Sequence, residues 1–379
     1  MKYDYVFINT HPIQYNAPFY RFLSHDMNVC IYYLTNNHRR DPGFKREVSW
    51  DIDLFGGYKY EFFNNHLFGR NVNKRFGVFS HKLLVRLWRE ARGQKYVLPA
   101  WNPWIFLFSA LVIRIRGGQV ILRIETPHNQ YFTHSKNFSL YLRYIQIYFW
   151  KIVSHKFLYI GTQNKLLWQH IGVENSRLFF AGYCVDNNRF RQDREIDNNS
   201  RGNIINNFIF VGKLSKKKRL DFLIEAFKGA THYAADISLS VVGDGELKDW
   251  LINNIKDAGN INYLGFKNQS ELAEIYNHHD CIILPSGHGE TWGLVINEAL
   301  NFGLTAITSD CIGSGYDLIN DKNGKVFKLD DKSSLIQAIL NLREMGLSRK
   351  EIYEENMSIL DRFSYESYKK TLISLKNLS

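Results

Sequence analysis

Cysteines are few in this chain of 379 residues, and they form no recognised motif. The four lie far apart in the sequence: Cys30, Cys184, Cys281 and Cys311. Zinc and redox motifs place two cysteines close together, and small disulfide-stabilised domains carry a much higher share of them. We therefore expect reduced, mostly buried thiols, with neither a disulfide framework nor a zinc site.

Long apolar runs are also missing. No stretch reaches the roughly 18 apolar residues that indicate a membrane-spanning helix, and the longest candidate, residues 104–116, contains two arginines at its end. The first apolar run is interrupted by Asn9 and His11 and is too short for a secretory signal. The chain has no G-x-G-x-x-G after its first apolar run and no G-x-x-x-x-G-K-[ST], which argues against a dinucleotide dehydrogenase and a P-loop ATPase. We expect a cytoplasmic protein that does not span a membrane.

Acidic residues are scarce in the first half of the chain. Residues 1–190 carry 25 Lys and Arg against 11 Asp and Glu, whereas residues 191–379 carry 23 against 26. A basic half implies an anionic partner, which can be a nucleic acid, a phospholipid surface or a phosphorylated substrate.

Short apolar segments alternate with helical patterns along most of the chain. The expected strands are residues 3–10, 28–35, 96–101, 119–126 and 156–162, then 207–214, 237–245, 261–266, 281–286 and 305–310. Strands that alternate with helices form parallel sheets covered on both faces, so the pattern predicts an α/β fold with two doubly wound, Rossmann-like domains. We place the domains at residues 1–188 and 189–364, with a polar linker at 184–206. An amphipathic helix at about 365–379 is expected to pack back on the first domain.

Two loops of the second half combine glycine with charge at the end of an expected strand. Gly212 closes one strand, and four lysines and an arginine follow it before the next helix. Ammonium groups and free backbone N–H groups at such a place form an anion site, although a solvated basic loop has the same composition. In the second loop Gly243 and Gly245 flank Asp244, where a backbone can approach a ligand closely.

Two glutamates follow the expected strand at residues 281–286. Glu290 lies in the loop near a helix N-terminus, which favours a carboxylate, and Glu298 lies inside that helix among apolar residues. If every step between them is helical they are about 12 Å apart, too far to share a proton but suited to two polyol parts of one elongated ligand. An exposed loop glutamate and an ordinary helix glutamate would show the same spacing.

Several segments of the second half occur in the same order in one enzyme family. GETWGLVINEAL (residues 289–300) resembles the E-x7-E signature of retaining glycosyltransferases with the GT-B fold, particularly glycosyltransferase family 4. VGKLSKKKRLDFLIEAF (211–227) resembles that family's G-R-L-x-x-x-K-G motif, LSVVGDGELKDWL (239–251) its next strand-turn-helix, and SDCIGSGYDLINDKNGKVF (309–327) the block that closes the donor site. The resemblance implies two Rossmann-like domains facing across a cleft.

The resemblance also implies a role for each matching position. Lys213, where the family usually has Arg, and Lys218 hold the diphosphate of a sugar nucleotide. Arg219 stands where the family's motif usually has Gly. Glu290 contacts hydroxyls of the transferred sugar, and Glu298 binds the nucleotide ribose. The remaining donor-binding positions lie beside these groups and act through their backbone: Gly212, Gly243, Thr291, Trp292, Gly293 and Leu294. Because the lysines and a helix N-terminus can neutralise the leaving diphosphate, no metal and no other cofactor is expected.

The first half resembles the acceptor-side domain of the same family. THPIQYNAPFYRFL (residues 10–23) resembles a His-Pro-Ile-Gln variant of the first loop, which implies that His11 and Gln14 face the acceptor or the donor sugar. RIETPHNQYF (123–132) matches a region with a donor-sugar contact, and we nominate Glu125 and His128 from it. A purely structural role remains open for both histidines.

The resemblance leads to one enzymatic hypothesis. A sugar passes from a nucleotide-diphospho-sugar to a saccharide acceptor with retention at the anomeric carbon, and the departing phosphate takes the acceptor's proton. The expected catalytic groups are Glu290, Lys213, Lys218, His11 and His128. The setting is bacterial surface polysaccharide assembly (capsule, O-antigen or exopolysaccharide) on a lipid-linked acceptor at the inner face of the cytoplasmic membrane.

Three alternatives remain open at this stage. The basic, aromatic stretches 70–95 and 140–157 can lie on an anionic bilayer, or they can be core-packed helices with solvated basic faces. A nucleotide-sugar epimerase or a phosphorylase could share the fold. A nucleic-acid-binding protein could use the basic half, but its stacking aromatics would have to share one exposed sheet face.

Overall fold

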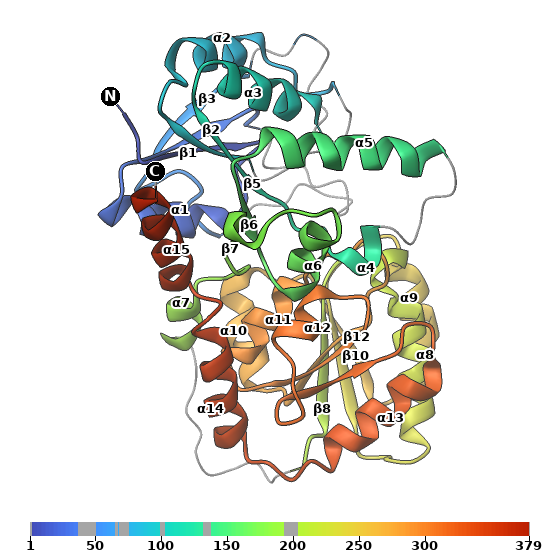
Figure 1. Cartoon of the computed structure of the whole chain (residues 1–379). Helices are drawn as coiled ribbons and strands as arrows, with labels where there is room; N and C mark the ends of the chain where they lie inside the picture. The colour runs from blue at the N-terminus through green and yellow to red at the C-terminus, as the bar shows by residue number, and fades with distance from the viewer. Residues whose placement is uncertain are drawn as a thin grey trace. The chain divides into compact units, whose positions relative to one another are not determined.

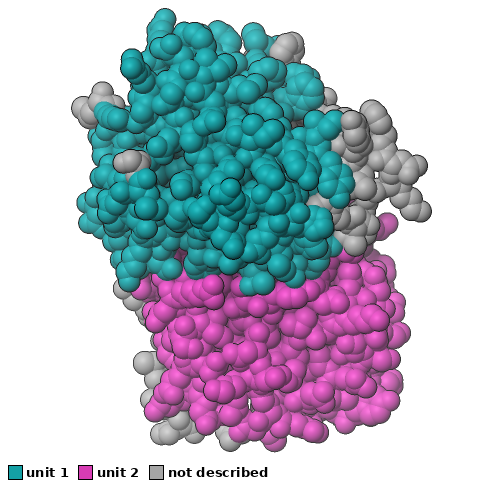
Figure 2. All heavy atoms as spheres, in the orientation of Figure 1, with its two compact units in different colours: residues 1–38, 52–182, 365–379 teal, residues 39–51, 183–364 magenta. Residues whose placement is uncertain are grey.

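A computed structural model describes residues 2–36, 51–64, 67, 76–98, 103–131, 138–192 and 204–378; for residues 138–142 and 192 it describes the backbone only. The chain divides into two compact units, each built on a parallel sheet (Figures 1 and 2). The first unit comprises residues 1–38, 52–182 and 365–379, and the second comprises 39–51 and 183–364.

The described part of the first unit contains a seven-stranded sheet in the order β3-β2-β1-β4-β5-β6-β7. Its strands are β1 (Tyr5–Asn9), β2 (Val29–Tyr33), β3 (Lys59–Phe62), β4 (Lys95–Leu98), β5 (Gln119–Arg123), β6 (Lys156–Tyr159) and β7 (Leu178–Phe180). Every pairing is parallel, and β1 and β2 are buried along their whole length. Strands that are covered on both faces read as continuous apolar runs, which is why the sequence pattern predicts them.

The helices of the first unit cover both faces of this sheet. They are α1 (Asn16–Asp26), α2 (His81–Glu90), α3 (Trp104–Ile115), α4 (His128–Tyr131), α5 (Phe138–Val153), α6 (Thr162–His170), the 3-10 turn η1 (Asn175–Arg177) and α15 (Tyr365–Asn377). The last helix, α15, returns from the second unit and packs on α1 and β7 (Figure 1). The Tyr5 hydroxyl donates to the Leu372 carbonyl at 2.7 Å, and the rings of Phe19 and Tyr368 stack at 4.5 Å.

The second unit contains a six-stranded parallel sheet in the order β10-β9-β8-β11-β12-β13 among its described residues. Its strands are β8 (Asn207–Val211), β9 (Ser238–Val242), β10 (Ile261–Gly265), β11 (Cys281–Leu284), β12 (Thr305–Ser309) and β13 (Gly324–Phe327). Its helices are α7 (Asn187–Gln192), the 3-10 turn η2 (Lys216–Lys218), α8 (Leu220–Thr231), α9 (Lys248–Ile255), α10 (Gln269–Asn277), α11 (Leu294–Leu300), α12 (Gly313–Asp317), α13 (Lys332–Arg343) and α14 (Arg349–Leu360).

The α/β alternation predicted from the sequence is confirmed, but some elements were missed. The second unit has a sixth strand, β13, where five were expected, and the first unit has β3 and β7 in addition. The expected linker at residues 184–206 includes helix α7, and its residues 193–203 lie outside the described residues. So do residues 99–101 of one expected strand and residues 70–75 of one basic stretch.

Two further expectations concern the cysteines and the apolar helices. All four cysteines are buried and none forms a disulfide. Within the described residues, no helix combines the length and the apolar character that crossing a membrane requires.

Candidate functional site

The strand order of the second unit reverses between β8 and β11. From β8 the chain proceeds to β9 and β10 on one side, and then β11 returns to the other side of β8. Ligands of open α/β sheets bind beyond the carboxyl ends of the strands at such a switch point. The loop after β8 carries the lysine run, and the loop after β11 carries Glu290, so the topology brings these two predicted segments together.

Lys218 and Glu290 form an ion pair between the two loops. The Lys218 ammonium contacts Glu290 Oε2, and each side chain is only 15% exposed. The loops are also joined through their backbones, because the Gly287 N–H donates to the Lys217 carbonyl at 3.2 Å. Gly289 has a φ of 96° and lies so close to Lys217 that a Cβ at this position would be 3.2 Å from Lys217 Cε. The carboxylate and the lysines therefore form one compact cluster.

The lysine cluster keeps Glu290 ionised. Burial alone would raise the pKa of Glu290, but the ion pair with Lys218 and the charges of Lys217 and Lys213 outweigh it and lower that pKa. The pKa of Lys217 is also lowered, first because its ammonium is shielded from water and further by Lys218 and Lys213. A carboxylate of this kind accepts hydrogen bonds and is a poor proton donor, while the lysines supply positive charge for an anion.

The glycine turn after β9 packs directly on the loop after β8. Gly243 has a φ of 145°, and a Cβ there would lie 1.8 Å from the Gly212 carbonyl oxygen. A Cβ on Gly245 would lie 2.5 Å from the Leu214 carbonyl oxygen. Two backbone hydrogen bonds join the same segments, from the Leu214 N–H to the Asp244 carbonyl and from the Leu247 N–H to the Leu214 carbonyl, both at 2.9 Å. Only glycine fits at Gly243, and the contact fixes the course of the lysine loop.

Arg219 occupies a position that favours glycine. Its φ of 53° and ψ of 37° are left-handed, and it lies between η2 and α8. Its guanidinium forms an ion pair with Asp330, which also has a positive φ of 65°, and lies 5.1 Å from the Phe222 ring centroid. The chain therefore makes a left-handed turn here at a residue that is not glycine.

The segment after Glu290 is held by the first residues of α12. The N–H groups of Gly313 and Ser314 donate to the carbonyls of Thr291 and Trp292 at 3.2 and 3.3 Å. Gly293, with a φ of 87°, is the N-cap of α11, and Leu294 is the first residue of that helix. The side chain of Trp292 is buried, and its Nε1 donates to Asn297 Oδ1 at 2.8 Å.

Glu298 lies inside the second unit. This residue is part of α11 and is only 1% exposed. Tyr276 donates its hydroxyl proton to Glu298 Oε2 at 3.2 Å, and the Gln269 amide lies 3.5 Å from Oε1. The Gln269 carbonyl oxygen in turn accepts from Arg189 at 3.2 Å. The sequence reading missed Tyr276 and Gln269, because a tyrosine and a glutamine in an amphipathic helix read as ordinary packing residues.

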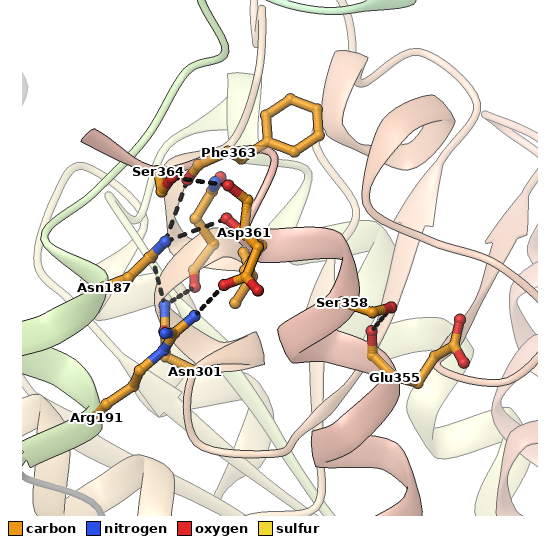
Figure 3. Close-up of polar contacts among 10 residues, drawn as sticks. Asn187, Arg191, Asn301, Glu355, Ser358, Asp361, Phe363 and Ser364 are labelled. Atoms are coloured by element: carbon orange, nitrogen blue, oxygen red, sulfur yellow. Dashed lines mark hydrogen bonds and ion pairs between the residues drawn. The ribbon is translucent and has the colours of Figure 1, made fainter. Parts of the chain in front are cut away.

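A polar network supports the end of α11 (Figure 3). The Asn301 amide donates to Asn187 Oδ1 at 2.9 Å, and the Asn187 amide donates to the carbonyls of Leu360 and Phe363 at 3.3 and 3.2 Å. Arg191 of the same helix, α7, forms an ion pair with Asp361 at 3.2 Å. This network ties α7 and the end of α14 to the helix that carries Glu298.

The residues nominated in the first half all lie in the first unit, after β1 and β5. The His11 ring lies 2.9 Å from the Thr10 hydroxyl, and Gln14 Oε1 is buried without a hydrogen-bond partner among the described residues. Glu125 forms an ion pair with Arg123 at 3.7 Å. His128 begins α4 and packs its ring 5.0 Å from His170, and burial followed by the His170 charge lowers the pKa of His128. The carboxyl ends of parallel strands share one edge, so these groups lie at one edge of that sheet.

The chain contains one D-x-D tripeptide, at residues 51–53. Asp51 accepts the Ser270 N–H at 3.0 Å, and Asp53 accepts the N–H groups of Phe55 and Gly56 at 2.9 and 3.1 Å. Asp53 therefore holds the local backbone, and Asp51 holds the backbone at Ser270, which is distant in sequence. Among the described residues, no group of three or more His, Cys, Asp and Glu side chains is arranged to hold a metal ion.

Comparison with known proteins connects this site to one family. Residues 191–358 match the family model of the glycosyl transferases group 1. All of the matched residues lie in the second unit. Glycogen synthase of Mycobacterium tuberculosis is 28% identical over 134 residues, which are 35% of this chain and 32% of that enzyme. The chain thus spans about a third of that relative's length.

One further relative and one solved structure match over much more of the chain. UDP-Gal:alpha-D-GlcNAc-diphosphoundecaprenol alpha-1,3-galactosyltransferase of Escherichia coli is 24% identical over 277 residues, which are 69% of this chain and 70% of that enzyme. The crystal structure of Anabaena Alr3699/HepE in complex with UDP superimposes with a TM-score of 0.70 at 13% identity and covers 100% of both chains. With two parallel-sheet, Rossmann-like units, the chain has the GT-B fold, as predicted from the sequence.

Proposed function

We propose that this protein is a retaining glycosyltransferase of family 4, which moves a sugar from a nucleotide-diphospho-sugar to a saccharide acceptor. The observation that carries the proposal is the cluster of Lys213, Lys217 and Lys218 around the ionised Glu290, at the switch point of a glycosyl transferases group 1 domain. The lysine ammonium groups match the negative charge of the diphosphate in a sugar nucleotide. The Glu290 carboxylate, which accepts hydrogen bonds, matches the hydroxyl groups of its sugar.

The chemistry follows from the charges of these groups. Lys218 and Lys213 stabilise the negative charge that develops on the leaving diphosphate, the term that dominates transfer reactions of this kind. Glu290, with its lowered pKa, accepts hydrogen bonds from the sugar hydroxyls and orients the sugar. The departing phosphate takes the acceptor's proton, so no side chain has to act as a nucleophile. Because lysines supply the positive charge, the reaction proceeds without a metal.

The relatives support a uridine nucleotide and a lipid-linked acceptor. One similar structure holds UDP, and the name of the Escherichia coli relative specifies a UDP-sugar and a diphosphoundecaprenol-linked acceptor. We extend both to this chain and place it in bacterial surface polysaccharide assembly, at the inner face of the cytoplasmic membrane. The strongly basic first half of the sequence agrees with an acceptor of this anionic kind.

A nucleotide panel with a lysine variant tests the proposal. Thermal unfolding is measured with UDP, GDP, dTDP, ADP and CMP for the wild type and for Lys218→Ala, and Lys256→Ala, an exposed lysine on the same unit, is the matched control. A ligand at about 100 times its dissociation constant stabilises the folded state by about 2.7 kcal/mol. We expect one nucleoside diphosphate, UDP first, to stabilise the wild type and the control but not Lys218→Ala.

Turnover separates the proposal from the other reactions of the fold. With the donor that the panel identifies, a transferase releases the nucleoside diphosphate faster when a saccharide acceptor is added, and Lys218→Ala lowers that rate by at least about tenfold. Epimerisation of the donor without acceptor, or release that depends on inorganic phosphate, would identify an epimerase or a phosphorylase. A wild type that responds to no nucleotide would refute the donor site.

A further inference from the structure

Apolar side chains are exposed in two regular stripes on the first unit. On α3, Phe108, Leu111 and Ile115 are exposed, and on α5, Ile145, Tyr148 and Ile152 are exposed. Both stripes have the spacing i, i+3, i+7, which places each set of three on one side of its helix. On the neighbouring α2, Trp88 is exposed as well. Surface helices of a soluble protein normally turn polar residues outward. Exposed apolar stripes of this kind therefore indicate a surface that binds a partner.

Helices α2, α3 and α5 cover the same side of the sheet, and their exposed apolar residues face away from it. The opposite sides of α2, α3 and α5 enter one core cluster, to which they contribute Leu87, Ile113 and Trp150 among others. Helix α3 contacts both α2 and α5 (Figure 1). Arg116, directly after α3, donates to the Trp88 carbonyl at 2.7 Å and lies 4.9 Å from its ring, which joins the end of α3 to α2. We call the exposed sides of α2, α3 and α5 the outer face.

The charge of the outer face selects one kind of partner. Helices α3 and α5 contain no Asp or Glu, and Glu90 is the single acid of α2. Basic residues flank the apolar stripes, and Lys82, Arg89 and Arg114 are exposed among them. Apolar residues bordered by Lys and Arg, with a tryptophan at the boundary, are the composition of a surface that inserts shallowly into an anionic bilayer.

We propose that the outer face of the first unit docks on an anionic lipid bilayer, with the stripes of α3 and α5 inserted and the basic side chains at the headgroups. This deepens the membrane setting of the proposed function by naming the surface. The stretches that hold α2 and α5 are basic and aromatic in the sequence, and the structure adds α3 and the apolar stripes.

Vesicle binding with matched variants tests this proposal. The full chain is sedimented with phosphatidylcholine vesicles that contain or lack phosphatidylglycerol. Ile152→Asp places a charge on a residue that is 75% exposed in the first unit, and Tyr233→Asp does so on a residue that is 76% exposed in the second. We expect the wild type to bind only the anionic vesicles, Ile152→Asp to lower binding by about tenfold, and Tyr233→Asp to bind like the wild type.

Reversing the charge of basic residues on the outer face tests the electrostatic part of vesicle binding. Lys82→Glu with Arg89→Glu should reduce binding to anionic vesicles by about tenfold or more, and raised salt should weaken the wild type in the same direction. The control reverses Lys256 and Lys350, two exposed lysines of the second unit. Equal loss in the control would show a general charge effect and overturn the assigned face.

Two other results would also overturn the proposal. The first is a wild type that ignores anionic vesicles. The second is a wild type that sediments as a dimer in the absence of lipid and becomes monomeric with Ile152→Asp, because the stripes would then be covered by a second copy of the chain. Thermal stabilisation by UDP is measured on the same variants. Lost vesicle binding with retained UDP binding locates the defect in the outer face and leaves the proposed donor site intact.

Discussion

Replacing Glu290 by glutamine tests whether the Glu290 carboxylate and a bound diphosphate compete for the same lysine ammonium groups. Lys218 is paired with Glu290, and Lys213 and Lys217 are near enough to act on the Glu290 carboxylate. A bound diphosphate would compete with the Glu290 carboxylate for these ammonium groups and would be repelled by it. We therefore expect Glu290→Gln to bind UDP more tightly than the wild type while it transfers sugar more slowly, since an amide holds the sugar hydroxyls less well.

The burial of the pair sets the size of both effects. Breaking a fully buried ion pair costs about 3–5 kcal/mol, and an exposed pair contributes about 0–1 kcal/mol. Each side chain here is 15% exposed, close to the buried limit, but the amide of glutamine still donates and accepts hydrogen bonds. We expect Glu290→Gln to lower the free energy of unfolding by about 2 kcal/mol. Removal of a competitor worth about 1.4 kcal/mol tightens UDP binding by about tenfold.

The pH dependence gives an independent check. The pKa of Glu290 is lowered from its usual 4.5 in the folded protein, so the ionised group stabilises the fold above about pH 4.5 and this contribution is lost as the pH falls through the lowered pKa. The difference in free energy of unfolding between the wild type and Glu290→Gln should therefore be constant near pH 7 and shrink below about pH 4.5.

Calorimetric titration of UDP at pH 7 and denaturant unfolding at several pH values measure these effects. Glu274→Gln, an exposed glutamate of the same unit, is the control and should change neither quantity. Unchanged or weaker UDP binding by Glu290→Gln would refute the reasoning, because the carboxylate would then not compete with the diphosphate for Lys218.

Three further predictions follow from the same site. Gly243→Ala should destabilise the fold by about 3 kcal/mol or more and abolish UDP binding, because its Cβ would lie 1.8 Å from the Gly212 carbonyl oxygen. The control is Gly259→Ala, whose Cβ meets nothing within 4 Å and which should be tolerated. Equal melting temperatures for the two variants would contradict the packing argument. Trp292→Phe should cost about 1–3 kcal/mol in denaturant unfolding, because Asn297 Oδ1 loses the indole donor; an unchanged midpoint would show that this bond contributes little. Turnover should survive a chelator, because lysines supply the positive charge, and activity that returns only with Mg²⁺ or Mn²⁺ would contradict this.

The strands that the sequence failed to predict share one property: they lie at sheet edges. Strands β3 and β13 each end their sheet in the strand order, and β7 ends the first sheet at its other side. Central strands are covered on both faces and read as apolar runs, whereas β3 has two exposed residues, Lys59 and Tyr60, and β13 begins Gly324–Lys325. An edge strand needs fewer apolar residues, so its sequence carries a weaker signal.

The site was predictable as separate segments but not as a cluster. The sequence predicts the lysine run and Glu290 as parts of the site, but a separation of 72 positions between Lys218 and Glu290 leaves their contact undetermined. That contact depends on β11 returning to the side of β8, which is a property of the strand order. The same order explains why the pKa of Glu290 is lowered, since an isolated buried carboxylate would shift in the opposite direction.

Arg219 shows how a departure from a family pattern can preserve a turn. The family's motif has glycine there, and glycine adopts the left-handed conformation without strain. An arginine at a φ of 53° costs conformational energy, and its side chain is held by the ion pair with Asp330 and by the ring of Phe222. The turn matters because the next residue begins α8 and the preceding one is Lys218, so the backbone at Arg219 sets the direction in which Lys218 leaves the loop. Contacts made by the arginine side chain thus replace the conformational freedom of glycine, and Lys218 keeps its reach to Glu290.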